Sequence, residues 1–500
     1  MEAPWIAELR ALLGPRGIID DPTQLFPYEA DGIVLLRRRP ELVLLPRTTE
    51  QVSRALKILH RERVPVVARG AGTGLSGGAT PVEGGVVVSL ARMRDVLELD
   101  AVDRTARVQA GLVNIDLSLA SSKHQLFYAP DPSSQQACTL GGNIAENSGG
   151  PHCFRYGNTT QHVLGLVIVL EDGTVLDLSE PRVDPLGYDL VGLFVGSEGM
   201  FGIATELVLK LLPKPATTET MLAIFESLDA ACDATSDLIR ARHEPSAIEI
   251  LDKLTIQAVE ASVYAAGYPK TAEAVLLLDI EGSEVEVANT VAGIEPLVRA
   301  RGAIEVRTAK TDLERKQLWA GRKGAFGAMG RIAPDLYVAD VCVPRTKLRE
   351  LVAHTTRIAR EKNLKLATVF HAGDGNLHPN IAYDRRDADE VRRVLEAGDE
   401  IMHLCIEAGG SLSGEHGVGL EKMKAMEWLF TREDLATMCR VREAWDPDRR
   451  MNPGKLIPIR ACLEMKQAVV RPGSNESTGD AEDAGNAENV RSITNAGSER

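Results

Sequence analysis

Three loops rich in glycine and small polar residues constrain the fold of this chain more than any other feature of its sequence. The first, RGAGTGLSGGATPVEGG at 69–85, lies between the β-rich runs VPVVA and VVVSL. A Rossmann dinucleotide fingerprint has to open a helix within a βαβ unit. Here Gly, Thr and Pro continue up to Val86, which outweighs the suitable distance of Asp95 as a ribose-binding acid. The loop is therefore predicted to join strand to strand.

The same glycines fit a different use. Successive backbone N–H groups in such a loop can form a nest that binds a pyrophosphate, although a flexible surface loop is the alternative. The second loop, PDPSSQQACTLGGNIAENSGG, covers 130–150, and the third, GSEGMFG, covers 196–202. Their Asn and Ser residues could simply form local turns. Three loops of one kind, each flanked by strands, favour one extended polar ligand.

The stretch HAGDGNLHPN, residues 371–380, predicts a β-hairpin with histidines on both arms. A two-residue loop of Asp374 and Gly375 would place His371 directly opposite His378, with Cβ atoms roughly 4.5–5.5 Å apart. Two imidazoles at that distance could share a metal ion, and the alternative is two ordinary hairpin histidines. A catalytic metal site usually has a third protein ligand, for which Glu415 in SGEHGVG is the candidate.

Composition excludes several classes of protein. The 500 residues exceed one typical hydrophobic core, so two or three structural units are expected. A formal net charge of −14 argues against nucleic acid as the main partner. No apolar run approaches the ~18 residues of a membrane span, and the cytoplasm is the default location. The seven cysteines form no C-x-x-C pair, which gives no support for a zinc ribbon, an iron–sulfur cluster or a disulfide framework.

The pattern of elements predicts an α+β protein in successive parts. Residues 1–36 are expected to be a helical segment that packs on the next part, and 37–215 to be strands interrupted by the glycine-rich loops. Residues 216–458 alternate strands with longer amphipathic helices, and the Pro-rich segment 211–220 is the expected boundary. Residues 459–500 form a C-terminal extension whose composition predicts disorder from about residue 471.

Six motifs in order carry a resemblance to a known family: RGAGTGLSGGA, the second loop, GSEGMFGIATE, HAGDGNLHPN, SGEHGVG and MNPGK. Together they resemble the flavoproteins related to vanillyl-alcohol oxidase, over roughly residues 20–458. Within these the chain is most similar to the FAD-linked subunit of glycolate oxidase and to D-lactate and D-2-hydroxyglutarate dehydrogenases. The resemblance implies a two-part FAD-binding domain, followed by an α+β substrate (cap) domain with an antiparallel sheet.

The resemblance also implies which residues bind FAD. The first and second loops would wrap the pyrophosphate and ribityl region, Glu198, Gly199 and Ile203 would lie towards the adenine, and Asn452 would approach the flavin ring. The implied residues of the two loops are Arg69, Gly70, Ala71, Gly72, Thr73, Gly74, Leu75, Ser76, Pro130, Asp131, Ser134, Thr139, Gly142, Asn143, Asn147, Ser148 and Gly149. Some relatives hold FAD covalently through a histidine in the first loop. No histidine occurs between His60 and His124, so noncovalent FAD is expected.

The family uses the residues matching His371, His378 and Glu415 as metal ligands. Two imidazoles and a carboxylate suit Zn²⁺, Mn²⁺ and Fe²⁺ alike. Because the flavin already carries the electrons, a redox-inert role is preferred for the ion, with Zn²⁺ or Mn²⁺ expected. Such an ion would coordinate the carboxylate and 2-hydroxyl of the substrate and lower the hydroxyl pKa. His416 would be the general base, and the alternative is that it only orients Glu415.

Arg322 stands where the family places an arginine on the substrate carboxylate, and a guanidinium can clamp a carboxylate through two hydrogen bonds. A solvated helix face is the alternative interpretation of this residue. D-2-hydroxyglutarate enzymes hold a second carboxylate with Thr and Lys at positions that match Phe326 and Val338 here. Two apolar residues favour glycolate or D-lactate, with a D-2-hydroxyglutarate dehydrogenase as the alternative.

The expected activity is FAD-dependent oxidation of a small D-2-hydroxy acid to the 2-oxo acid, by hydride transfer from C2 to flavin N5. The resemblance to the glycolate oxidase subunit implies iron–sulfur and second flavin-domain partner subunits, quinone as the final acceptor, and peripheral association with the inner membrane. Molecular oxygen is an alternative acceptor. A non-catalytic flavin-binding scaffold is the competing class of function, and it would not need His371, His378, Glu415 and His416.

Overall fold

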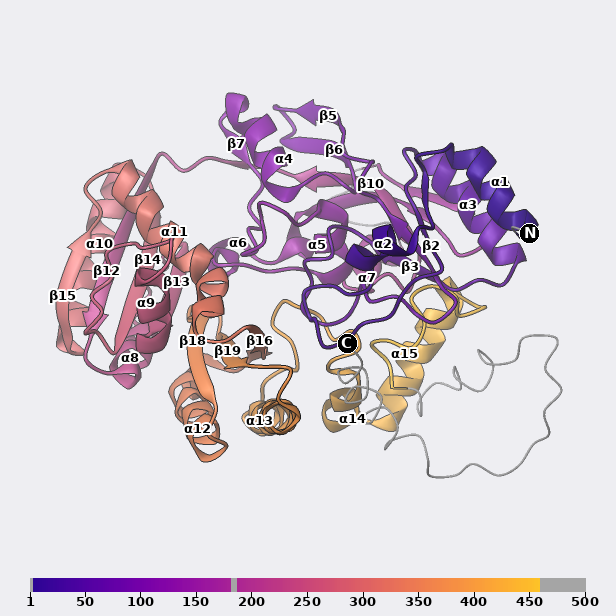
Figure 1. Ribbon diagram of the computed structural model, residues 1–500. Helices are drawn as coiled ribbons and strands as arrows, with labels where there is room; N and C mark the ends of the chain where they lie inside the picture. The colour runs from indigo at the N-terminus through magenta and orange to yellow at the C-terminus, as the bar shows by residue number, and fades with distance from the viewer. Residues whose placement is uncertain (1–2, 181–186, 459–500) are drawn as a thin grey trace.

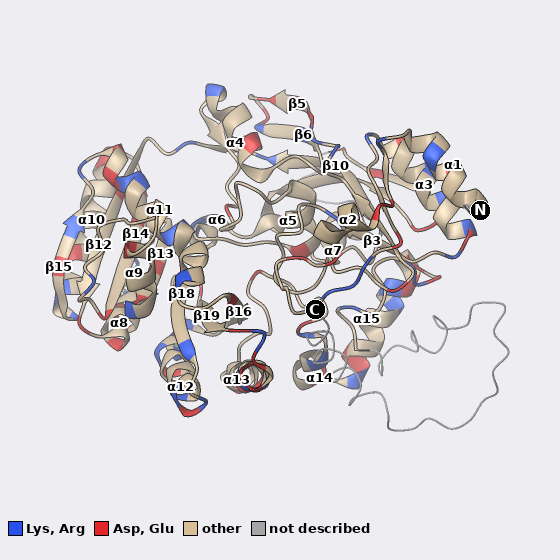
Figure 2. Cartoon of the chain, in the orientation of Figure 1, with Lys and Arg blue, Asp and Glu red and all other residues tan. Residues whose placement is uncertain are grey.

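The computed structural model describes residues 3–180 and 187–458, so the expected disordered tail lies outside the described residues. The chain forms two parts side by side, each with its own sheets (Figure 1). Lys and Arg are mixed with Asp and Glu along the outer helices of both parts (Figure 2). No helix among the residues described combines the length and hydropathy needed to cross a membrane.

The first part contains a small mixed sheet that carries the first glycine-rich loop. Its strand order is β1 (Ile18–Ile19), β2 (Leu42–Leu44), β4 (Val86–Ser89) and β3 (Val66–Arg69). β3 and β4 are parallel neighbours, and residues 70–85 connect them without a helix. This confirms the strand–loop–strand prediction and excludes a Rossmann βαβ unit. The N-terminal segment is only partly helical, with α1 (Pro4–Leu13) and α2 (Pro22–Leu25) on either side of β1.

A five-stranded antiparallel sheet completes this part. Its order is β5 (Val96–Asp100), β6 (Thr105–Gln109), β10 (Ile203–Lys210), β8 (Val163–Val169) and β9 (Val175–Leu178). The helices of this part include α3 (Thr49–Arg61), α4 (Asn114–Ser121), α5 (Leu140–Glu146), α6 (Cys153–Tyr156) and α7 (Leu190–Phe194). A short pair, β7 (Leu126–Phe127) with β11 (Leu212–Pro213), precedes the second part.

The second part is built on a large antiparallel sheet. Its order is β15 (Ala303–Thr308), β12 (Thr217–Phe225), β14 (Ala274–Gly282), β13 (Ala247–Asp252), β18 (Lys365–His371), β19 (Asn376–Tyr383) and β16 (Asp335–Val338), and β17 (Val341–Cys342) also pairs with β19. The expected α+β class with an antiparallel cap sheet is therefore confirmed.

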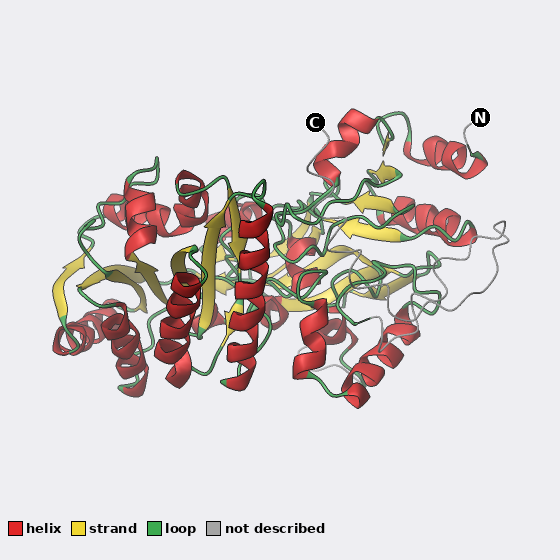
Figure 3. Cartoon of the chain, turned by 60° about the horizontal axis from the view of Figure 1, so that its bottom comes forward, coloured by secondary structure: helices red, strands yellow, loops and turns green. Residues whose placement is uncertain are grey.

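Helices cover both faces of this sheet (Figure 3). One face packs against α8 (Leu228–Arg240), α10 (Glu284–Ala300), α12 (Leu348–Glu361) and α13 (Ala388–Glu407). The other face packs against α9 (Lys253–Glu260) and α11 (Asp312–Ala328). Because side chains alternate along a strand, Met221 and Ala223 of β12 enter the first core and Leu222 enters the second.

The chain returns to the first part after the large sheet. After α14 (Met426–Leu429), the chain forms α15 (Arg432–Trp445), whose last residue, Trp445, enters the core of the first part. Met451 enters the same core and forms a parallel bridge with Val66. Residues 413–419 precede this crossing. The loop that holds the SGEHGVG motif therefore lies between the two parts.

The hairpin forms, but its predicted register is wrong. His371 pairs with Asn376, and His378 pairs with Val369, so the loop contains four residues rather than two. The reason is competition from the neighbouring strand: the N–H of Ala372 donates to the carbonyl of Ile248 at 2.8 Å. A slip of two positions keeps every side chain on its face of the sheet. The two histidines are therefore diagonal neighbours on one face.

Candidate active site

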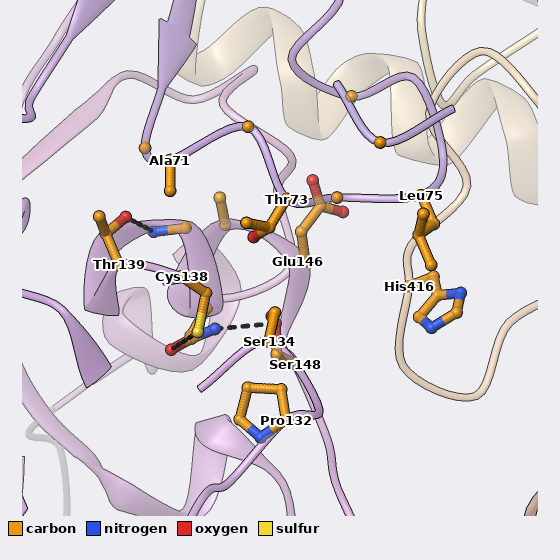
Figure 4. A pocket seen from close by; sticks show the side chains of 18 of the residues that line it. Ala71, Thr73, Leu75, Pro132, Ser134, Cys138, Thr139, Glu146, Ser148 and His416 are labelled. Atoms are coloured by element: carbon orange, nitrogen blue, oxygen red, sulfur yellow. Dashed lines mark hydrogen bonds between the residues drawn. The ribbon is translucent and has the colours of Figure 1, made fainter. Parts of the chain in front are cut away.

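A cavity of about 520 Å³ lies between the two parts. The glycine-rich loops line one side, and side chains of the large sheet and of α11 line the other. Most of the residues implied to bind FAD line it, namely Arg69, Gly70, Ala71, Gly72, Thr73, Gly74, Leu75, Ser134, Thr139, Gly142, Asn143, Ser148, Gly149, Glu198, Gly199 and Ile203. Figure 4 shows Thr73, Leu75, Thr139 and Ser148 around the cavity, with His416 at one end. Segments far apart in the sequence thus share one cavity.

Five implied residues do not line this cavity: Ser76, Pro130, Asp131, Asn147 and Asn452. Asn452 is buried, and its Nδ2 donates to the carbonyls of Gly78 and Glu198 at 3.0 and 2.6 Å. Asn147 ends α5 with a positive φ of 53°, and its Oδ1 accepts from the N–H of Thr160. These side chains hold loops together, and their roles in binding FAD stay predictions.

The glycine-rich loops fit a long polar ligand. Thr139 caps α5 by accepting a hydrogen bond from the N–H of Gly142 at 3.3 Å (Figure 4). A Cβ added to Gly142 would meet only the Thr139 hydroxyl, so this side of the glycine opens into the cavity. Gly72 has a φ of +73°, and a Cβ there would collide with the Arg69 guanidinium. Glycine is needed at Gly72 for its conformation and at Gly142 for the space it leaves.

The three predicted metal ligands meet at the edge of the cavity, where His378 and Glu415 belong to the lining and His371 does not. Oε1 of Glu415 lies 3.2 Å from Nε2 of His371 and 3.1 Å from Nε2 of His378. One atom from each residue falls in a group whose members are all within 4.8 Å of one another. The second carboxylate oxygen of Glu415 is buried and has no hydrogen-bond partner among the described residues. This donor set fits a divalent cation.

The charges of this group depend on one another. Burial would lower the pKa of His371, but the carboxylates of Glu249 and Glu415 raise it well above the usual value. Burial would likewise raise the pKa of Glu415, but His371 and His378 lower it well below its usual value. The site therefore favours a carboxylate at Glu415, the state in which it can bind a cation.

His416 lines the cavity beside this group. Its ring lies parallel to that of His378, with centroids 5.1 Å apart and planes at 10°. Burial lowers the pKa of His416 to about 4, so the imidazole is neutral near neutral pH. Its Nδ1 is buried and has no hydrogen-bond partner within the described ranges. The ring is placed to accept a proton from a ligand in the cavity.

Arg322 is not on a solvated helix face, because it is only 3% exposed. Its Nε donates to Oε2 of Glu249 at 2.5 Å, and its Nη2 lies 3.3 Å from Nδ1 of His371. The residue lines the cavity together with His378 and Glu415. Arg322 therefore brings a fixed positive charge to the metal-ligand group.

Two functional candidates were missed by the sequence analysis: Glu249 and Asp340. Glu249 stands in the apolar run AIEIL and pairs with both His371 and Arg322. Asp340 lies between β16 and β17 and accepts hydrogen bonds from the loop that holds Glu415. A single acid inside an apolar strand pattern is the signal that could have found them, since a buried carboxylate needs partners.

Glu198 has a more definite place than its implied position near the adenine. Its two carboxylate oxygens each accept a hydrogen bond at 2.7 Å, from the N–H groups of Val418 and Gly419. Glu198 has a positive φ of 50°, and its carbonyl accepts from Asn452. The third glycine-rich loop thus holds the far end of the segment that carries His416.

Four apolar or aromatic side chains of the second part also line the cavity. They are Tyr264, Phe326, Val338 and Val369. The two positions compared with the dicarboxylate enzymes, Phe326 and Val338, are both among them. The described lining of the cap side also contains Lys323, but its Nζ is directed to the Oδ2 of Asp131 at 3.1 Å.

Comparisons with known proteins agree with this architecture. Residues 40–179 match the model of the FAD binding domain, and 214–456 match that of the C-terminal domain of FAD linked oxidases. The chain is 45% identical over 457 residues to glycolate oxidase subunit GlcD of Escherichia coli, covering 91% of each chain. It is 32% identical over 460 residues to a D-lactate dehydrogenase of Anaerostipes hadrus, covering 90% and 95%. The structure of p-cresol methylhydroxylase superposes with a TM-score of 0.78 at 18% identity, covering 91% and 97%.

Proposed function

This chain belongs to the FAD-linked oxidases, a family that includes glycolate oxidase subunits and D-lactate dehydrogenases, and from that premise we propose that it oxidises glycolate or D-lactate to the 2-oxo acid. The observation that carries the proposal is a convergence at one end of the cavity. A metal-ligand group, a neutral imidazole and a buried guanidinium all lie there. A 2-hydroxy acid has the matching groups, a carboxylate beside a hydroxyl.

The chemistry divides between bound groups and protein residues. When bound, FAD supplies an acceptor for the hydride of C2, and a divalent ion supplies a Lewis acid for the hydroxyl and carboxylate oxygens. His371, His378 and Glu415 would hold that ion, with Zn²⁺ or Mn²⁺ proposed. Arg322 binds the carboxylate, which fixes the substrate, and His416 removes the hydroxyl proton. The protein thus orients the alcohol and takes its proton.

The apolar lining supports a short substrate. Phe326 and Val338 offer no cation to a second carboxylate, and burying an unpaired carboxylate against the buried Val338 would be costly. Lys323, which follows Arg322 in α11 and also lines the cavity, is already paired with Asp131. We therefore propose a monocarboxylate, and D-2-hydroxyglutarate is the second candidate because Lys323 could exchange partners.

The electrons have to leave the flavin after each turnover. Of the described cysteines with free thiols, Cys138 and Cys153 belong to the first part and Cys232, Cys342 and Cys405 to the second, so these five do not form the four-cysteine cluster that an iron–sulfur relay requires. The Escherichia coli relative is named as a subunit of glycolate oxidase. We propose that this chain passes electrons to an iron–sulfur partner in a similar complex with a second flavin-domain subunit. The complex would act in the cytoplasm or peripherally at the inner membrane.

Anaerobic mixing of the purified flavoprotein with glycolate, D-lactate, L-lactate and D-2-hydroxyglutarate tests the proposal. We expect the flavin absorbance near 450 nm to bleach with glycolate or D-lactate and to persist with L-lactate. Fastest bleaching by D-2-hydroxyglutarate would replace the proposed substrate with a dicarboxylate. A yellow protein that none of these acids reduces would favour a flavin-binding scaffold.

A further inference from the structure

Two carboxylates outside the predicted ligand set lie fully buried behind the site, Glu249 in β13 and Asp340 between β16 and β17, each 0% exposed. We infer that they are positioning residues: Glu249 fixes one metal-binding histidine together with the substrate-binding arginine, and Asp340 fixes the second histidine together with the loop of the third ligand. The inference rests on the proposed function, because it assigns these residues to the metal site proposed there.

Glu249 uses both carboxylate oxygens. Its Oε1 lies 2.6 Å from Nδ1 of His371, and its Oε2 accepts from Nε of Arg322 at 2.5 Å. Glu249 and His371 are directly opposed on β13 and β18, so the sheet itself sets this contact. A carboxylate on Nδ1 selects the tautomer whose Nε2 lone pair is free for a metal. Nε2 is the atom of His371 that faces Glu415.

Asp340 anchors the loop that carries Glu415 and His416. Its Oδ2 accepts hydrogen bonds from the Ser413 hydroxyl at 2.6 Å and from the N–H groups of Glu415 and His416 at 3.3 and 3.0 Å. Both oxygens also lie within 3.2 Å of the Gly414 nitrogen. Consecutive backbone N–H groups that converge on one carboxylate fix the path of the loop, and the path fixes where Glu415 projects.

Asp340 also faces the second histidine. Its Oδ1 lies 3.8 Å from Nδ1 of His378, and no hydrogen-bond partner for that nitrogen is found in residues 3–180 and 187–458. At this separation the carboxylate faces the imidazole without a direct hydrogen bond. Asp340 therefore stands behind His378 as Glu249 stands behind His371, and in each case Nε2 is left towards Glu415.

Each carboxylate is balanced by a buried cation. Arg322 pairs with Glu249, and Lys422, which is 1% exposed, donates to Oδ2 of Asp340 at 3.1 Å. Such pairs cost more in desolvation than apolar packing, so stability alone gives weak grounds for their presence. Their geometry, with every oxygen directed at a ligand residue, its loop or Arg322, gives a functional reason.

The test is a titration of the FAD-loaded, metal-stripped protein with Mn²⁺, with the free ion followed by its paramagnetic resonance signal. Glu249→Gln and Asp340→Asn are expected to raise the Mn²⁺ dissociation constant about 10–100-fold, the usual effect of losing an outer partner of a metal ligand. The variants should also differ in kinetics. Glu249→Gln should mainly raise KM, because Arg322 loses its anchor, whereas Asp340→Asn should mainly lower the rate of flavin reduction.

Asp252→Asn is the matched control. Asp252 is a carboxylate of the same sheet that accepts hydrogen bonds from the backbone N–H groups of Thr255 and Thr368, and it touches none of the proposed ligands. Its replacement should lower stability without changing Mn²⁺ affinity. If Asp340→Asn does not fold, Ser413→Ala removes one hydrogen bond to Asp340, keeps the Lys422 pair, and should still weaken Mn²⁺ binding.

The outcomes distinguish a failure of the proposed metal site from a failure of the positioning role of Glu249 and Asp340. A wild-type protein that binds no Mn²⁺ or Zn²⁺ stoichiometrically would overturn the proposed metal site and this inference with it. Wild-type binding with unchanged affinity in Glu249→Gln and Asp340→Asn, or in Ser413→Ala where it replaces the latter, would overturn the inference alone. The inference would also be overturned if Asp252→Asn weakened Mn²⁺ binding to the same degree, because loss of stability would then explain the weaker binding in all the variants.

Discussion

Oε1 of Glu415 lies 3.1 Å from Nε2 of His378, although the first residue belongs to a loop between the two parts and the second to a strand of the large sheet. The same oxygen lies 3.2 Å from Nε2 of His371. Without a metal, an oxygen at hydrogen-bond distance from both nitrogens needs a hydrogen atom on each nitrogen. A cation that takes the place of those hydrogen atoms would release protons, which couples metal affinity to pH.

Replacing His378 should therefore remove the metal. His378→Ala is expected to lower the metal content, measured by elemental analysis, from about one ion per chain to background. Flavin reduction should slow at least about 100-fold, since a Lewis acid contributes several kcal/mol to such a step. FAD should stay bound, because the glycine-rich loops are unchanged. His403→Ala, an exposed histidine of α13, is the control, and equal metal content in both variants would refute the ligand assignment.

His416 has a separate role from the ligands, and its replacement should show this. His416→Gln is expected to keep FAD and metal but to slow flavin reduction about 10²–10⁴-fold, the usual contribution of a general base. Anaerobic stopped-flow measurements of flavin bleaching give the rate. A variant that reduces flavin at the normal rate would remove His416 from the mechanism. A variant that loses the metal would show that it only orients Glu415.

Arg322 should act on substrate binding through its planar guanidinium. Arg322→Lys keeps the charge but loses the two-pronged geometry, so KM for D-lactate or glycolate should rise about tenfold or more while FAD stays bound. Steady-state kinetics with a dye acceptor measure this. Arg331→Lys, an exposed arginine just after α11, should leave KM unchanged. If both variants had the wild-type KM, the carboxylate would bind elsewhere.

The sequence was sufficient to find the parts of the site that lie in continuous motifs. The glycine-rich loops and the residues His371, His378, Glu415 and His416 each carry local signals of turn, hairpin or ligand chemistry. The hairpin register failed, because the Asp-Gly signal describes an isolated hairpin. The hydrogen bond from Ala372 to Ile248 belongs to a neighbouring strand more than a hundred residues earlier in the chain.

Glu249 and Asp340 show which contacts could not be predicted from the sequence. Nothing near either acid in the sequence names its partners, since Glu249 meets His371 across paired strands and Asp340 meets residues 413–416 across a loop. Such contacts depend on strand order, which no local pattern contains. Asp131 is a further example, because nothing in the second loop indicates that its carboxylate contacts His152 and Lys323.

Space at Gly142 should decide FAD affinity. Because the nearest atom to a Cβ there is the Thr139 hydroxyl at 3.3 Å, Gly142→Val should shift this helix-capping side chain slightly and place atoms in the cavity. FAD affinity should fall at least about tenfold, equivalent to roughly 1.4 kcal/mol. Fluorescence titration of the apoprotein with FAD measures it. Gly330→Val, where a Cβ meets nothing within 4 Å, is the control, and equal FAD affinity in both variants would place the cofactor away from Gly142.

The contact between Asp131 and His152 should make stability depend on pH. Nδ1 of His152 lies 3.0 Å from Oδ2 of Asp131, and its Nε2 lies 3.8 Å from Oδ2 of Asp279 in the large sheet. Lys323 also pairs with Asp131, and the Trp319 ring stacks on the imidazole. Burial alone would lower the pKa of His152, but Asp131 and Asp279 raise it to about 10. The pKa of Asp131 is lowered, against the effect of burial, by His152 and Lys323.

A histidine whose pKa is raised on folding adds stability that is complete below its unfolded pKa of about 6.5 and is lost as the pH rises through its folded pKa. The free energy of unfolding of the wild type should therefore exceed that of His152→Gln by roughly 3 kcal/mol near pH 6, and the difference should be much smaller near pH 10. It should also shrink below the unfolded pKa of Asp131, about 3.9, as that carboxylate takes up its proton. Urea unfolding at several pH values measures the difference. His124→Gln, at an exposed site, should show no such dependence, and a gap between wild type and His152→Gln that stays constant from pH 6 to pH 10 would mean that His152 is neutral in the folded protein.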